Sequence, residues 1–168
     1  MTERGAVTHI PDNAVCDYFV PDPPESLIAI GWLDPEHDFP RGSVSKEFFV
    51  KLLTLLKDPW QPVVFAGVHQ CELCQFSGGS RAQFDGKWIP GASWENLFVP
   101  YNGRLFVAPE LIAHYIAAHR YLPPVEFFDA VLACPEMGSM GYNRALLANG
   151  GRELMRRLEA QGRGPSAD

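Results

Sequence analysis

The 168-residue chain carries little positive charge and has no long apolar run. Its 14 Lys and Arg residues are outnumbered by 20 Asp and Glu residues, which gives a formal net charge of −6 at pH 7. A protein that follows the phosphates of a duplex needs a basic surface, so nucleic acid is disfavoured as a partner. The longest apolar runs are about seven residues, far below the roughly 20 that a membrane helix requires.

An export signal is also lacking, because the N-terminus, MTERGAVTHIPDN, contains no apolar core of the kind that such signals have. We therefore expect a cytoplasmic protein without membrane partners. Cysteine is scarce, with four residues in the chain. In a reducing compartment a close cysteine pair is expected to bind a metal or to act in redox chemistry. Cys71 and Cys74 form such a pair, whereas Cys16 and Cys134 are expected to be buried thiols.

What the chain does have is the composition of a globular protein, with 46% hydrophobic and 20% charged residues. This length suits one domain with a substantial core. We predict a single globular zinc-binding domain over residues 1–162 and a mobile tail over residues 163–168. The 15 prolines and 15 glycines divide the chain into short elements, and no repeat is visible.

The first half of the chain predicts two strands and one helix. Residues 26–33 are a compact apolar run that is typical of a buried strand. Residues 43–58 place apolar side chains on a broad helical face, with Ser43 or Ser45 as the N-cap. Residues 62–69 predict a second strand that leads into the cysteine pair.

The second half predicts hairpins followed by helices. Asp85-Gly86 and Asn102-Gly103 are the residue pairs preferred in tight hairpin turns. Helices are predicted over residues 109–119, 123–134, 139–151 and 152–162, with Gly150 and Gly151 as a stop between the last two. The fold class is therefore α+β: a small antiparallel sheet with hairpins, a zinc knuckle and a C-terminal group of helices.

The C-x-x-C pair is the strongest chemical signal. Zn²⁺ prefers thiolate and imidazole in a tetrahedron, and a turn between two cysteines can direct both sulfurs at one ion. His114 and His119 follow with four residues between them, a spacing seen in zinc-binding His pairs. On a regular helix these two side chains point about 140° apart, so joint ligation requires the last turn to loosen. His69 competes, because it faces the same side of an extended strand as Cys71.

Other chemistries receive less support. A redox pair normally opens a helix after a strand, which Cys71 does not do clearly. A catalytic zinc would need an open position and a base, for which Glu72 and Glu110 are candidates, but two thiolates make the metal a poorer Lewis acid. His9 and His37 are expected to be surface residues, and DPEHDFP (residues 34–40) is expected to be a solvated loop.

Four segments, AIGWLDPEHDFPRG, GVHQCELC, NLFVP and LFVAPELIAHYIAAHRYLPPVEFFDAVLACP, together resemble a family of uncharacterised bacterial proteins of similar length. The resemblance covers most of the chain, from Ile28 to Pro135, and it implies a bacterial domain with a metal-like site but no particular activity. The family's H-x-C-x-x-C and H-Y-I-x-x-H elements correspond to His69, Cys71, Cys74, His114 and His119.

These observations predict a bacterial cytoplasmic protein in which Cys71, Cys74 and two of the three histidines hold a structural zinc ion. Its predicted role is that of a protein-interaction or regulatory module, with another protein as partner. The alternative is a zinc-dependent hydrolase or nuclease with His114 or His69 near an open coordination position.

Overall fold

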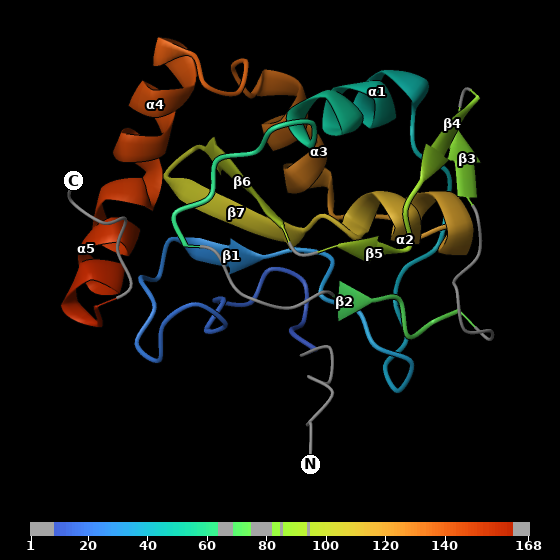
Figure 1. Ribbon diagram of the computed structural model, residues 1–168, viewed down its shortest axis with the longest axis horizontal. Helices are drawn as coiled ribbons and strands as arrows, with labels where there is room; N and C mark the ends of the chain where they lie inside the picture. Colours follow the sequence, from blue (N-terminus) through green and yellow to red (C-terminus); the bar gives the residue numbers. More distant parts are fainter. Residues whose placement is uncertain (1–8, 64–68, 75–81, 85, 94, 163–168) are drawn as a thin grey trace.

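The computed structural model of the protein describes residues 9–63, 69–74, 82–84, 86–93 and 95–162. Within these residues the strands form one three-stranded sheet and two two-stranded pairs (Figure 1). The central sheet has the strand order β1 (Leu27–Ala29), β7 (Arg104–Pro109), β6 (Asn96–Tyr101). The smaller pairs are β2 (His69–Gln70) with β5 (Ala92–Ser93), and β3 (Ala82–Phe84) with β4 (Lys87–Ile89).

Strands β6 and β7 form the hairpin that the sequence predicts at Asn102-Gly103. Tyr101 pairs with Arg104, and the two turn residues have φ angles of 52° and 79°. Positive φ at both central positions is the geometry that this residue pair favours. Strand β1 runs parallel to β7, with Leu27 opposite Leu105, so the central sheet is mixed. The sequence pattern did not predict this parallel pairing, because it joins segments from distant parts of the chain.

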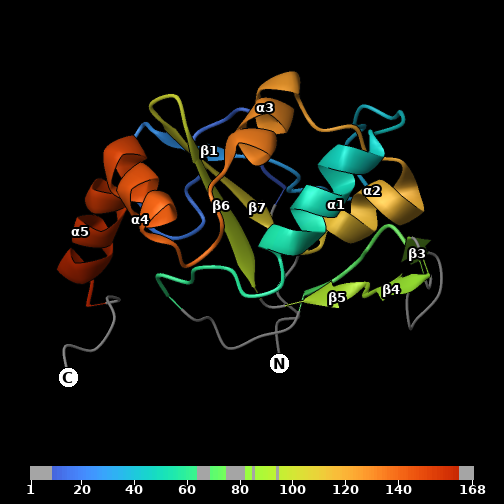
Figure 2. The same cartoon turned by 90° about the horizontal axis from the view of Figure 1, so that it is seen from above.

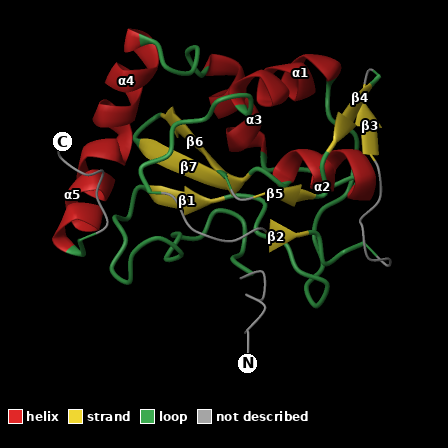
Figure 3. Ribbon diagram, in the orientation of Figure 1, coloured by secondary structure: helices red, strands yellow, loops and turns green. Residues whose placement is uncertain are grey.

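The helices follow the predicted order, and most of them come after the strands in the chain. Figure 3 distinguishes the helices from the strands by colour. They are α1 (Lys46–Leu55), α2 (Ile112–His119), α3 (Val125–Ala133), α4 (Met140–Leu146) and α5 (Arg152–Ala160), with the π-helical segment η1 (Leu147–Gly151) before α5. The N-cap of α1 is Ser45, whose Oγ accepts a hydrogen bond from the backbone N–H of Phe48 at 3.2 Å. The fold class is α+β with a C-terminal helix group, as predicted.

The predicted stop at Gly150 and Gly151 is an interruption between α4 and α5. Gly150 has a φ of 105°, which L side chains rarely adopt. A Cβ at Gly150 would collide with Ser26 Oγ, and one at Gly151 would lie 2.6 Å from the carbonyl oxygen of Leu146. Glycine at both positions therefore lets η1 pack closely, and η1 lies against β7.

A row of aromatic rings links the central sheet to two helices. The ring of Phe106 on β7 lies 6.1 Å from that of Phe127 on α3, which in turn lies 6.2 Å from Phe48 on α1. All three side chains are buried, as are the thiols of Cys16 and Cys134. The hydrophobic core therefore extends from the sheet through α3 to α1, and both thiols belong to it as predicted.

The two ends of the molecule are built from different secondary-structure elements. Helices α4 and α5 stand together at one end, whereas α2 and the β3–β4 pair lie at the opposite end in both views (Figures 1 and 2).

The segment before β1 runs antiparallel along the free edge of that strand, with bridges from Ile10 to Trp32 and from Val15 to Ile28. No helix among the described residues is long and apolar enough to cross a membrane.

Three predictions fall partly or wholly on residues that the structure does not describe. Residues 64–68 of the strand predicted over 62–69 lie outside the described residues, and β2 begins at His69. Asp85 lies outside them too, although β3 and β4 pair on either side of it as the hairpin prediction requires. The predicted tail, residues 163–168, is also outside the described part of the chain.

Candidate metal centre

The cysteine pair is attached to the segment between β4 and β5. Strand β2 pairs with β5 and ends at Gln70, which is opposite Ala92. The next residue, Cys71, donates its backbone N–H to the carbonyl oxygen of Gly91 at 2.9 Å. These bonds fix the start of the turn that carries both thiols, with Cys71 buried and Cys74 half-buried.

Both histidines come from α2, and the end of this helix is wider than a regular α-helix. The carbonyl oxygen of Tyr115 accepts hydrogen bonds from the backbone N–H groups of Arg120 and Tyr121. A bond that spans five residues belongs to a widened turn, and Arg120 then closes the helix with a φ of 57°. This is the loosening that joint ligation by His114 and His119 requires.

The ligand atoms of Cys71, Cys74, His114 and His119 all lie within 4.8 Å of one another. Cys74 Sγ lies 3.3 Å from His114 Nε2 and 3.5 Å from His119 Nε2, and Cys71 Sγ lies 3.4 Å from His119 Nε2. In a tetrahedral zinc site the bonds are about 2.3 Å to sulfur and about 2.0–2.1 Å to nitrogen, so a ligating sulfur and a ligating nitrogen lie about 3.5 Å apart. The cluster could therefore hold a metal ion with little rearrangement.

The His114 ring is held in place by Gly91. A Cβ at Gly91 would lie 3.2 Å from His114 Cε1 and 3.4 Å from its Nδ1, which is tighter than most real contacts. His114 is 0% exposed, and its Nδ1 has no hydrogen-bond partner among the described residues. The Nδ1 side of the ring therefore packs against a residue without a side chain, while Nε2 on the other side lies 3.3 Å from Cys74 Sγ.

Burial determines the protonation of the metal-free cluster. The pKa of Cys71 is raised to about 12, chiefly by burial, while hydrogen bonds from backbone N–H groups oppose the rise and the neighbouring Cys74 adds to it. Burial also lowers the pKa of His114 to about 4, with His119 adding to the effect. For His119, burial and then the charge of Arg41 lower the pKa. Because a bound cation stabilises thiolates and neutral imidazoles, it would remove the cost of burying these groups.

His69, the third histidine considered as a ligand, lies outside the cluster. Its Nε2 is 3.1 Å from the hydroxyl oxygen of Tyr18, and the two rings meet edge to face with centroids 6.2 Å apart. Although His69 is only two residues from Cys71, the backbone turns at Cys71, so the side chains do not continue the alternation of an extended strand. The hydrogen bond to Tyr18 gives His69 a separate role.

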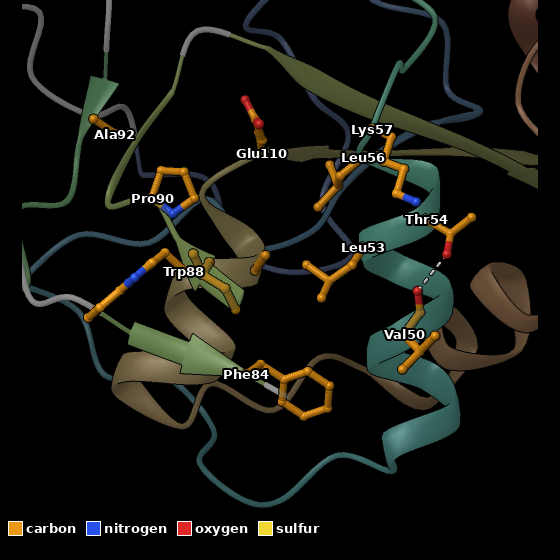
Figure 4. A pocket seen from close by; sticks show the side chains of 12 residues that line it. Val50, Leu53, Thr54, Leu56, Lys57, Phe84, Trp88, Pro90, Ala92 and Glu110 are labelled. Carbon is orange, nitrogen blue, oxygen red and sulfur yellow. Dashed lines mark hydrogen bonds between the residues drawn. The ribbon is translucent and has the colours of Figure 1, made fainter. Parts of the chain in front are cut away.

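An apolar cavity of about 320 Å³ lies between α1 and the segment that carries Gly91. In Figure 4 the side chains of α1 face Trp88 and Pro90 across this space. Glu110, one of the two candidate bases, lines the cavity, and Glu72 is exposed in the cysteine turn. Pro90 and Ala92 line the cavity while Gly91 between them touches His114, so one short segment joins the cavity to the metal centre.

Sequence reasoning missed a second group of potential ligands. His9, Asp34 and His37 offer ligand atoms that lie within 4.8 Å of one another. His37 is exposed, as predicted, but the sequence carries no signal that His9 lies beside it, because a bridge between distant residues brings the two segments together.

Neither the curated proteins nor the solved structures give a match to this chain. The model of one protein family, described as a domain of unknown function (DUF7919), matches residues 8–132. The match runs from before β1 into α3 and includes Cys71, Cys74, His114 and His119. Because it covers most of the chain, the protein belongs to the DUF7919 family.

Proposed function

We propose that the protein is a zinc-binding domain in which Cys71, Cys74, His114 and His119 hold one structural zinc ion. The observation that supports this proposal is the convergence of the four ligand atoms within 4.8 Å. Two thiolates and two imidazoles are a common zinc donor set, and Zn²⁺ accepts a tetrahedron without preference from d electrons. Hard cations such as Mg²⁺ prefer oxygen ligands and fit this donor set poorly.

Four protein ligands favour a structural role over a catalytic one. A catalytic zinc keeps one position for water or substrate, whereas a tetrahedron of four protein ligands is closed. Two thiolates also donate charge to the metal and weaken its Lewis acidity. The hydrolase or nuclease alternative needs one of these ligands to leave, and the close sulfur–nitrogen distances do not favour that.

The zinc ion would tie the turn after β2 to the C-terminal half of α2. The strands in this region, β2 and β5, have two residues each and provide few backbone hydrogen bonds. No disulfide joins them, because all four cysteines are free thiols. Metal binding would therefore supply stability that these short strands cannot, as it does in small metal-binding units.

We further propose that the cavity beside α1 binds an apolar side chain of a partner protein, which makes the domain an interaction module. Trp88 is 60% exposed at the cavity, and Val50 is exposed on the opposite wall. Exposed aromatic residues beside an apolar hollow are typical of protein-binding surfaces. Lys57 also lines the cavity, so a partner segment with an acidic residue beside its apolar residue fits best. The bacterial and cytoplasmic setting remains a prediction.

Metal analysis of protein purified without added zinc tests the metal proposal. We expect about one zinc ion per chain in the wild type and its loss in Cys71→Ser and His119→Ala, because a tetrahedral site of four ligands needs each of them. His69→Ala is the matched control, since His69 is a nearby histidine outside the cluster, and it should retain the metal. A folded wild type without zinc would contradict the proposal.

The interaction proposal needs a separate experiment. Immobilised wild type, Trp88→Ala and Met140→Ala are incubated with an extract of the source cells, and retained proteins are quantified by mass spectrometry. Met140 is an exposed apolar residue on α4, at the other end of the molecule, and serves as the control. A true partner should be retained by the wild type and by Met140→Ala. Once this partner is purified, its affinity for Trp88→Ala should be at least tenfold lower than its affinity for the wild type. Equal binding to all three proteins would contradict a role for the cavity.

A further inference from the structure

His9, Asp34 and His37 form a compact polar cluster away from the cysteines. His37 Nδ1 lies 2.7 Å from Asp34 Oδ1, and His9 Nδ1 lies 3.8 Å from the same oxygen. The two imidazole rings are stacked, with centroids 3.8 Å apart and an angle of 3° between their planes. The two Nδ1 atoms therefore approach one carboxylate oxygen from neighbouring parallel rings.

The fold builds this cluster from two separate segments. The antiparallel bridge between Ile10 and Trp32 brings the residue before Ile10 alongside the chain that enters the loop at Asp34. Within the loop, Asp34 Oδ1 also accepts the backbone N–H of His37 at 3.1 Å, which directs the His37 side chain back toward Asp34. The segment before β1 is also bridged to that strand by Val15 and Ile28, so the cluster has a fixed frame.

His9 is the residue whose contacts are incomplete. Its Nδ1 is buried and has no hydrogen-bond partner among the described residues, and its distance of 3.8 Å to Asp34 Oδ1 is too long for a hydrogen bond. A buried polar nitrogen without a partner costs free energy, and a ligand that it can bind would remove that cost. The nitrogen faces a carboxylate and a second imidazole, which is the environment of a metal ligand.

We propose that His9, Asp34 and His37 form a second metal site, which takes a divalent transition-metal ion such as Zn²⁺ through two imidazoles and one carboxylate. Tetrahedral bonds of about 2.0–2.1 Å place two such ligand atoms about 3.3 Å apart, and the observed 2.7 and 3.8 Å lie on either side of this value. In the stacked arrangement the Nδ1 lone pairs lie in parallel ring planes and do not converge on one point, so binding requires one ring to turn. The side chain of His37 is 54% exposed and can rotate out of the stack to direct its Nδ1 at an ion shared with His9 and Asp34.

This site differs in kind from the cysteine centre, because three protein ligands leave at least one coordination position open. The cluster borders an open cavity of about 590 Å³, which His9 and His37 line together with Asp12, Phe39 and Pro123. A bound ion could therefore accept water or an oxygen of a small anionic ligand from the cavity side. The second site would exchange its metal more readily than the closed, largely buried cysteine centre.

Metal titration of the full chain with its cysteine centre already loaded with zinc tests this proposal. Adding Zn²⁺ and following the heat of binding should give a second equivalent in the wild type. Asp34→Asn retains an oxygen that can accept the His37 N–H but removes the negative charge, so it should weaken the second equivalent at least tenfold without loss of fold. His37→Ala should have the same effect, while His69→Ala serves as a control that binds as the wild type does.

The two metal proposals fail in different ways. A wild type that keeps one zinc ion per chain and takes up no second equivalent at saturating Zn²⁺ would overturn only the second site. Retention of the second equivalent in both Asp34→Asn and His37→Ala would also overturn it. To test for an open coordination position, Co²⁺ is bound at the second site of protein whose cysteine centre holds zinc. Addition of acetate should change the cobalt absorption spectrum. An unchanged spectrum would contradict an accessible position.

Discussion

Cys74 Sγ lies 3.3 Å from His114 Nε2, although 40 residues separate the two positions in the sequence. The contact joins a turn after a two-residue strand to a fully buried imidazole on α2. Between these positions lie the β3–β4 hairpin, strand β5 and the β6–β7 hairpin. The cluster of possible metal ligands thus connects a part of the chain with short strands to the main core.

Removal of the metal should destabilise the whole domain, because binding to the native state alone adds to the free energy of unfolding. We expect a chelator to lower the free energy of unfolding in urea by at least about 3 kcal/mol, a modest share of the binding energies found for structural zinc. His69→Ala should show the same loss on chelation as the wild type, because His69 lies outside the cluster. Urea curves that overlap with and without chelator would contradict a structural role.

Gly91→Ala should weaken metal binding without touching a ligand. The added methyl group would press on the His114 ring at 3.2 Å, and misplaced ligands typically lose about 10–100-fold in metal affinity. Competition with a chromophoric chelator measures this change. Gly141→Ala on α4 is the matched control, since its added Cβ meets Pro135 at an ordinary 3.4 Å and it should bind metal like the wild type.

The four thiols should fall into two reactivity classes. Burial raises the pKa of Cys16 to about 12 and that of Cys134 to about 11, so neither forms a thiolate at pH 8 and neither is accessible. Alkylation followed by mass spectrometry should leave both unmodified in the native protein. After chelation the half-buried Cys74 should react first, and Cys71, whose pKa is raised to about 12 by burial, should react more slowly than Cys74. All four thiols should react in concentrated urea. Modification of Cys71 in the metal-loaded protein at the rate seen in urea would argue against a closed site.

Tyr121 should make stability depend on alkaline pH. Burial raises the pKa of its hydroxyl, and the charge of Asp12 with the hydrogen bond to Asp12 Oδ2 at 2.7 Å raises it further. The native state therefore keeps this proton when the unfolded chain loses it, so the contribution is complete below about pH 10 and is lost as the pH rises above it.

Tyr121→Phe provides the measurement for that effect. At pH 7 it should lower the free energy of unfolding by about 1–3 kcal/mol, because the half-buried carboxylate of Asp12 loses the hydrogen bond from Tyr121. The difference between variant and wild type should shrink as the pH increases above about 10. A difference that stays constant across this range would rule out Tyr121 as the titrating group.

Local patterns in the sequence predicted most elements of this fold. The Ser45 N-cap, the Asn102-Gly103 turn and the interruption at Gly150 each depend on residues within a few positions of the feature itself. For the same reason C-x-x-C and H-x-x-x-x-H stood out as candidate ligands. Local patterns could not predict pairings between distant segments, as the parallel pairing of Leu27 with Leu105 illustrates.

Two structural details decide which histidines join the cysteines, and neither can be deduced from the spacing of residues in the sequence. The widened turn at Tyr115 lets His114 and His119 reach the same sulfur, and the hydroxyl of Tyr18 draws His69 away from the cysteines. The stacking of His9 on His37 similarly follows from the bridge between Ile10 and Trp32. Each detail is a contact across the tertiary structure, whereas the residue types themselves were visible in the sequence.

The parallel pairing of β1 with β7 has a consequence for the newly synthesised chain. Strand β1 leaves the ribosome early but must wait for residues 104–109 before the central sheet can form, and such non-local pairing folds slowly. Cys71 and Cys74 are translated in this interval, before either imidazole of α2 exists. Nascent thiols are then open to oxidation, so efficient maturation calls for a reducing environment and a prompt supply of metal once α2 emerges.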